Sequence, residues 1–94
     1  MPRAIWNEAV LVESDDTIIV EGDVYFPLES VNSNFLKQSS STSLCPRKGK
    51  AFFYDVVIDG TVNRDAAWYY LGPEKDFEQL KNRIAFWKGV ELRD

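Results

Sequence analysis

The chain has 94 residues, of which 45% are hydrophobic and 14% are aromatic. This length and apolar content predict a single domain over residues 1–94, with one modest core. The net charge of −4, from 11 basic and 15 acidic side chains, argues against binding along a phosphate backbone. We therefore expect no nucleic acid partner.

The sequence also lacks the patterns of membrane, secreted and zinc-binding proteins. No window approaches a membrane span, and residues 1–7 contain no apolar run of signal-peptide length. We therefore expect a cytoplasmic protein with no membrane partner, as a monomer or small homo-oligomer. One cysteine and no histidine exclude an internal disulfide and the common zinc ligand sets, and we expect no cofactor.

The N-terminal part is expected to form short strands joined by turns. Two β-branched runs, residues 9–13 and 17–21, flank the polar segment 14–16, which favours a β-hairpin. A third short strand is expected at residues 24–26. Pro27 should end it, because proline cannot donate a hydrogen bond to a strand ladder.

The next segment carries weaker signals. Ser30 could cap one helical turn, with Phe35 and Leu36 as buried anchors. Residues 39–43 are five hydroxyl side chains in a row, and we interpret them as an exposed loop.

The clearest strand signal lies in residues 52–58. Phe52, Tyr54, Val56 and Ile58 share one face, and Phe53, Asp55 and Val57 share the other. Both faces are largely apolar, which indicates a central strand. Residues 59–60, Asp-Gly, are typical of a tight turn. A returning strand is expected from residue 61, and residues 66–71 continue the β-rich pattern.

The C-terminal part predicts the one helix. After Gly72 and Pro73, residues 77, 80 and 84 are apolar at helical spacing, with acidic residues near the start. This pattern predicts an α-helix over residues 74–83. A closing strand pair is then expected from residues 84–87 and 90–92.

Together these elements predict a mainly β protein of the α+β class. The expected architecture is a small, single-domain antiparallel β fold with one C-terminal α-helix packed on the sheet.

The lone cysteine is followed by a basic turn, which is the first candidate site. Arg47, Lys48 and Lys50 surround Gly49 after Cys45 and Pro46, and such a turn can hold a phosphate or carboxylate through its cations and backbone N–H groups. The alternative interpretation is a solvated turn that protects a sheet edge.

Two further features bear on chemistry. Trp68 and Tyr70 share one face of their expected strand and could stack a planar ligand, although such aromatics also serve as core. Cys45 is a candidate nucleophile because Arg47 and Lys48 would favour its thiolate, but the chain has no histidine to act as base.

Several sequence blocks, taken in order, resemble one family. They are VEG with YFP, SV, CPRKG, DAAWYY and AFWKGVEL, and they resemble the family called domain of unknown function 427 over nearly the whole chain. The resemblance implies a compact, β-rich single domain with a loose nucleotidyltransferase-like label. It transfers no catalytic residue. The chain departs from the family pattern at Arg47, where an aromatic residue, commonly tryptophan, is usual.

The nucleotidyltransferase-like label would require carboxylates that hold a divalent metal ion. Glu21 and Asp23 are the candidate ligands, with Asp55 or Asp65 as a third, but Glu21 and Asp23 also fit a polar turn.

The leading hypothesis is a domain that binds a small anionic or nucleotide-like ligand near residues 45–49. The alternatives are a minor enzyme that uses the Cys45 thiol or the acidic residues, and a protein-interaction module that uses sheet edges.

Overall fold

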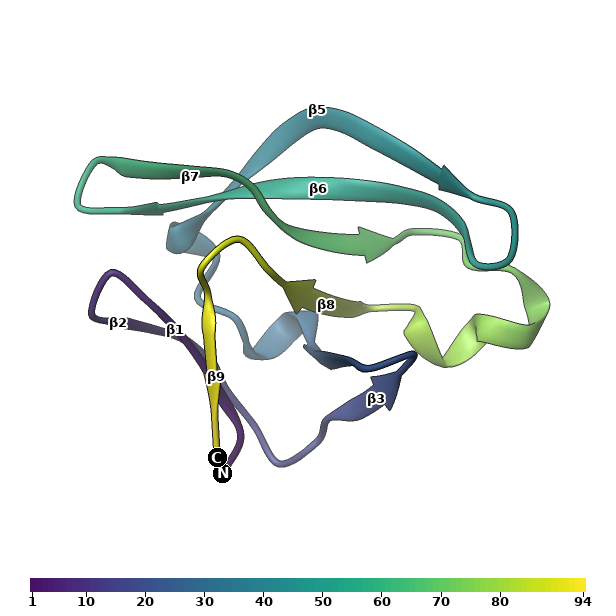
Figure 1. The fold of residues 1–94 in the computed structure, drawn as a ribbon, viewed down its shortest axis with the longest axis horizontal. Helices are drawn as coiled ribbons and strands as arrows, with labels where there is room; N and C mark the ends of the chain where they lie inside the picture. Colours follow the sequence, from purple (N-terminus) through teal and green to yellow (C-terminus); the bar gives the residue numbers. More distant parts are fainter.

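The computed structural model describes residues 1–94 as two antiparallel β-sheets (Figure 1). The strands are β1 (Arg3–Trp6), β2 (Ala9–Glu13), β3 (Ile18–Val20), β4 (Asp23–Pro27), β5 (Leu36–Cys45), β6 (Gly49–Ile58), β7 (Thr61–Tyr70), β8 (Arg83–Phe86) and β9 (Glu91–Arg93). Short 3₁₀ segments connect some of them: η1 (Leu28–Ser30), η2 (Ser33–Phe35) and η3 (Lys75–Leu80). The small sheet has the order β2-β1-β9, and the large sheet has the order β3-β4-β8-β7-β6-β5.

The strand predicted over residues 52–58 is confirmed as part of β6, which lies between β5 and β7. The tight turn that follows it is also confirmed, since Asp59 and Gly60 have φ angles of 48° and 78°, as a type I′ hairpin turn requires. The returning strand, β7, is continuous from Thr61 to Tyr70. Its pairing with β6 is interrupted by a bulge near Asp55.

The hairpin predicted from residues 9–13 and 17–21 is wrong. The first run forms β2 and pairs with β1, whereas the second contains β3 and pairs with β4. The polar segment 14–16 connects the two sheets instead. The Ser14 amide N–H donates a hydrogen bond to the Pro2 carbonyl. The hairpin turn lies after β3, where Glu21 and Gly22 have φ angles of 52° and 85°. The third strand is confirmed as β4.

The predicted C-terminal α-helix over residues 74–83 is also wrong. This segment forms only the 3₁₀ turns of η3, which are kinked at Phe77. The chain is extended again at Lys81, because Arg83–Phe86 pairs with strands on both sides as β8. Ile84, which completed the helical spacing, therefore belongs to the sheet. The fold is mainly β without an α-helix.

Three smaller predictions also need correction. The closing strands do not pair with each other, because β8 lies between β4 and β7 whereas β9 pairs with β1. The hydroxyl tract 39–43 is not a loop but part of β5, with a bulge between Gln38 and Thr42. Ser30 does not cap the expected helical turn: it is the last residue of η1, and the turn that follows, η2, is capped by Asn32.

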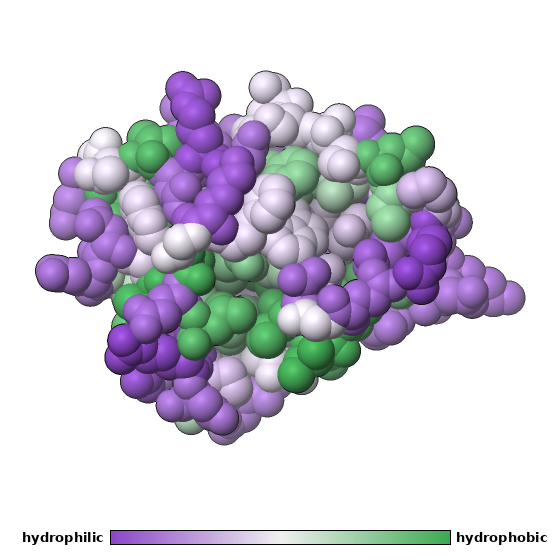
Figure 2. All heavy atoms as spheres, viewed as in Figure 1, coloured by the Kyte–Doolittle hydropathy of each residue, from purple (hydrophilic) through white to green (hydrophobic).

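The large sheet carries a hydrophobic core on each face. The main core lies between the two sheets and contains Phe26 and Ile84, whereas a smaller core on the other face contains Tyr25 and Ala85. These neighbours point to opposite faces because side chains alternate along a strand. In the view of Figure 2, hydrophobic residues gather between the two sheets and hydrophilic residues surround them. None of the helical segments has the length and apolarity that a bilayer crossing requires.

The turn between β5 and β6 is held tightly against the end of β7. Gly49 has a φ angle of 112°, and a Cβ built on it would lie 3.3 Å from the Gly72 carbonyl oxygen. The Glu74 amide donates a hydrogen bond of 2.9 Å to the Lys48 carbonyl. Only glycine combines this backbone conformation with so close an approach.

We expect Gly49→Ala to lower the free energy of unfolding by about 1–3 kcal/mol, since it adds backbone strain and a steric contact. Urea denaturation would measure the change. Gly72→Ala is the matched control, because nothing lies within 4 Å of its Cβ position, and it should change stability by less than about 0.5 kcal/mol. Equal effects of the two substitutions would contradict this account of the turn.

Candidate functional site

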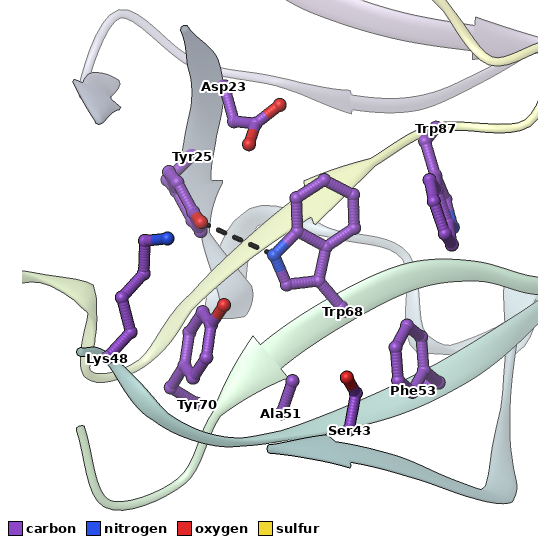
Figure 3. A pocket seen from close by; sticks show the side chains of 9 residues that line it. All are labelled: Asp23, Tyr25, Ser43, Lys48, Ala51, Phe53, Trp68, Tyr70 and Trp87. Carbon is purple, nitrogen blue, oxygen red and sulfur yellow. Dashed lines mark hydrogen bonds between the residues drawn. The ribbon is translucent and has the colours of Figure 1, made fainter. Parts of the chain in front are cut away.

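A cavity of about 290 Å³ opens on the face of the large sheet that carries the smaller core. Its lining residues come from four strands, one turn and the segment after β8 (Figure 3). They are Asp23, Tyr25, Ser43, Lys48, Ala51, Phe53, Trp68, Tyr70 and Trp87.

Strand alternation and side-chain size explain why the cavity lies here. Ala51 pairs with Tyr70 and Phe53 pairs with Trp68 across β6 and β7, so all four side chains point to one face. Trp68 pairs on its other side with Ala85 of β8. Large rings thus alternate with alanine across the strands, which leaves space between the rings.

One end of the cavity is aromatic. The Trp68 ring packs edge-on against Trp87, with a centroid distance of 5.6 Å, and Phe53 stacks on Trp87 at 6.4 Å. Trp87 is 46% exposed, but its Nε1 donates a 2.5 Å hydrogen bond to the Asp65 carbonyl. This wall is therefore fixed as well as accessible, which suits a planar ligand.

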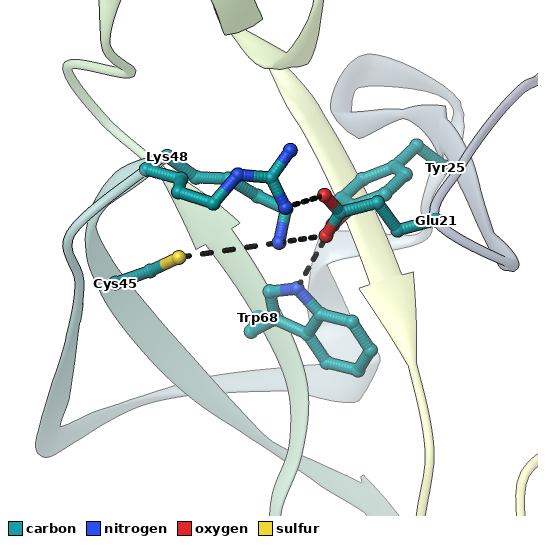
Figure 4. Close-up of polar contacts among 6 residues, drawn as sticks. Glu21, Tyr25, Cys45, Lys48 and Trp68 are labelled. Atoms are coloured by element: carbon teal, nitrogen blue, oxygen red, sulfur yellow. Dashed lines mark hydrogen bonds and ion pairs between the residues drawn. The ribbon is translucent and has the colours of Figure 1, made fainter.

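The other end of the cavity is polar and contains the Lys48 ammonium group. The Lys48 side chain is only 14% exposed, and its Nζ lies 2.5 Å from Glu21 Oε1 (Figure 4). Arg47 pairs with the second oxygen of Glu21. The hydrogen bond from Lys48 is the main cause that lowers the pKa of Glu21, and the same contact raises the pKa of Lys48. Lys48 therefore remains an ammonium group at the cavity.

Two tyrosine hydroxyls lie beside Lys48. Tyr25 is 1% exposed, and its oxygen accepts a 3.3 Å hydrogen bond from Trp68 Nε1. Burial raises the pKa of Tyr25 to about 12 and also raises the pKa of Tyr70. Both hydroxyls therefore stay protonated at neutral pH. The Tyr25 oxygen already accepts a bond from Trp68, so its O–H remains available to donate.

The candidate site residues between positions 45 and 49 lie at different places relative to the cavity. Cys45 is half-buried, 4.0 Å from Lys48 Nζ, and backbone N–H groups of Lys48 and then Arg47 lower the pKa of its thiol. Arg47 lies outside the cavity lining, with its guanidinium over the Phe77 ring. Gly49 is buried against the segment after β7. Of this group, only Lys48 lines the cavity.

The structure does not bring the candidate metal ligands together. Glu21 is held by its two cations, and Asp23 lines the cavity. Asp55 and Asp65 lie at the β6–β7 bulge, where the Asp65 carboxylate accepts bonds of 2.5 and 2.8 Å from two serine hydroxyls of β5. No three acidic or cysteine side chains gather closely enough to share a metal ion.

Sequence reasoning found Trp68, Tyr70 and Lys48 but missed the other walls. The sequence patterns indicate only strand or packing roles for Tyr25 and Trp87. Tyr25 reaches the site because β8 lies between β4 and β7, an order that no local pattern indicates. The spacing of Tyr25 from Asp23 was the available signal, since residues two apart share a face.

The ion pairs of Glu21 with Arg47 and Lys48 should make the free energy of unfolding depend on pH. Because the pKa of Glu21 is lowered in the folded state, its stabilising contribution is present above the ordinary value of 4.5 and is lost as the pH falls through the folded value. We therefore expect Glu21→Gln to destabilise the protein at pH 6–7, by an amount that shrinks below pH 4.5. Denaturation at a series of pH values would measure it. Glu29→Gln, an exposed control, should follow the wild type, and a pH-independent Glu21 effect would contradict the ion pair.

Comparison with known proteins places the chain in one family. A search among curated proteins found no match. A family model described as "Domain of unknown function (DUF427)" matches residues 2–93. The resemblance inferred from the sequence blocks is therefore confirmed, and the chain belongs to the DUF427 family.

Proposed function

We propose that this domain binds a small, planar ligand with a negatively charged group, anionic or nucleotide-like, in the cavity beside Lys48. The observation that carries the proposal is the largely buried Lys48 ammonium in a cavity whose far wall is aromatic. A buried cation next to stacking surfaces is the combination that recognises a charged group on a flat ring.

The polar end supports an anionic group in a specific way. Lys48 has three N–H donors, and Glu21 uses one side of the ammonium. The hydroxyls of Tyr25 and Tyr70 add neutral donors at the same end (Figure 3). Three donor side chains around one point suit the oxygens of a carboxylate or phosphate.

The size and lining of the cavity support a small ligand. Its volume of about 290 Å³ lies at the lower limit for ligand sites, and most of its lining residues are hydrophobic. Trp68 offers a ring between the polar end and the Trp87 wall. A ligand of this class would place its ring near Trp68 and its charged group near Lys48.

The two alternative functions draw less support from the geometry. The acidic residues do not converge, and the amine nearest the Cys45 thiol is already paired with Glu21. The long edge strand β5 carries a bulge in its middle, which disfavours edge-to-edge pairing with a partner strand. A cytoplasmic location and a monomeric or small homo-oligomeric state remain part of the proposal.

We expect benzoate and adenosine monophosphate to quench tryptophan fluorescence saturably, because Trp68 and Trp87 line the cavity. Lys48→Gln should weaken binding by about tenfold to a hundredfold, as the loss of a charge-assisted hydrogen bond implies. The matched control is Lys50→Gln. This substitution removes the same charge two residues away. The Lys50 Nζ lies over the Phe52 ring and does not line the cavity.

The control variant should bind both anions as the wild type does. Equal weakening in the two variants would indicate only general attraction by positive charge. That result, or the absence of saturable quenching with every anion, would contradict the proposal.

A further inference from the structure

We infer that the ligand class of this cavity is a planar aromatic monocarboxylate that also carries a hydrogen-bond donor, with Asp23 as the residue that selects for the donor. The inference rests on the proposed function, since it assumes that the Lys48 end holds an anionic group. It narrows the ligand class and separates aromatic carboxylates from nucleotides and free phosphate.

The first argument is the charge balance around the polar end. Arg47 and Lys48 are the cations there, and Glu21 already neutralises one of them through contacts to both. Asp23 adds a second carboxylate to the cavity lining. The two positive charges are thus matched by two negative ones before any ligand enters.

A ligand with one negative charge can be held under these conditions by local hydrogen bonds. Each further negative charge would be repelled by Glu21 and Asp23 without a compensating cation. The charge balance therefore favours a monoanion over a phosphate group, which carries up to two charges at neutral pH.

The second argument is the position of Asp23. Its carboxylate points into the cavity on the same side as Tyr25 (Figure 3). The negative charge of Asp23 contributes to the raised pKa values of both Tyr25 and Tyr70, whereas Lys48 acts on both in the opposite direction. The two hydroxyls therefore lie within the fields of an anion and a cation.

Asp23 is exposed at the rim of the cavity and has no partner in the protein. The ion pairs of the chain use other acidic side chains, and no side chain donates a hydrogen bond to Asp23. An unpaired carboxylate in a cavity lining accepts a hydrogen bond from an O–H or N–H group of the ligand. A ring bearing both a carboxylate and such a donor satisfies Lys48 and Asp23 together.

The third argument is the space between these groups. The aromatic wall and the small volume leave room for one ring system with short substituents. A nucleotide would bring a ribose and a phosphate in addition to its base. The compact cavity thus favours the same class as the charge balance.

The experiment is isothermal titration calorimetry of the wild-type protein with a panel of probes. The probes are benzoate, its three hydroxy isomers, adenosine monophosphate and inorganic phosphate. We expect at least one hydroxybenzoate to bind about tenfold more tightly than benzoate, since its hydroxyl donates to a charged acceptor. It should also bind at least about tenfold more tightly than either phosphate compound.

Asp23→Asn should then remove the advantage of the hydroxybenzoate over benzoate and should strengthen the binding of inorganic phosphate. Asp15→Asn is the matched control, because Asp15 is exposed as Asp23 is but lies outside the cavity, and it should preserve the wild-type order. The probe series with the wild-type protein tests the ligand class even if the Asp23 variant fails to fold.

The outcomes separate this inference from the proposed function. If adenosine monophosphate or phosphate binds more tightly than every hydroxybenzoate, and Lys48→Gln weakens that binding, the proposed function stands and this inference is overturned. If the hydroxyl gives no advantage in the wild type, or if Asp23→Asn preserves the advantage, the role of Asp23 is overturned. If no probe binds in a Lys48-dependent manner, the proposed function fails and this inference fails with it.

Discussion

The contact between the Glu21 carboxylate and the two cations of the β5–β6 turn organises the candidate site. It joins two hairpin turns that are far apart in the sequence, and it holds the Lys48 ammonium at the cavity in a largely buried position. Glu21 adopts a left-handed backbone conformation to do so, which is uncommon for a residue other than glycine, asparagine or aspartate. The same carboxylate limits the positive charge that remains for a ligand. The Glu21 contact therefore sets both the position of Lys48 and the low net charge of the polar end of the cavity.

The rest of the site follows from the two faces of the large sheet. One face packs against the small sheet and forms the main core, whereas the other carries a smaller core of the large sheet's own side chains and residues of η3. Because alanines alternate with large rings on this second face, packing is incomplete and a cavity remains. Asp65, at the β6–β7 bulge, supports the aromatic wall. Its carbonyl accepts the hydrogen bond from Trp87, and its carboxylate accepts hydrogen bonds from hydroxyls of β5. Polar bonds at the bulge thus support an apolar wall.

Local patterns predicted the long central strands but not the partners of the short ones. The alternation of residues 52–58 and the Asp59-Gly60 turn are local signals, and both were confirmed. The hairpin from residues 9–13 and 17–21 failed because strand pairing is decided by burial in two separate sheets. The helix over residues 74–83 failed because tertiary pairing of Ile84 with Phe26 in the sheet outweighed helical spacing.

The candidate site was predicted in part for the same reason. Lys48, Trp68 and Tyr70 lie on or beside the long strands, and the structure brings them to one cavity. Tyr25 lies on β4 and Trp87 directly follows β8, and the positions of these strands depend on the order of the whole sheet. The pairing of Glu21 with Lys48 is likewise a contact between turns that no spacing rule indicates.

The indole N–H signals in a nuclear magnetic resonance titration test the central claim, ligand binding in this cavity, most directly. The chain has three tryptophans: Trp68 and Trp87 line the cavity, whereas Trp6 packs against the main core. During titration with an aromatic carboxylate, the Trp68 and Trp87 signals should shift along one saturable curve while Trp6 stays in place. Equal shifts at all three tryptophans, or a shift confined to Trp6, would contradict binding at this site.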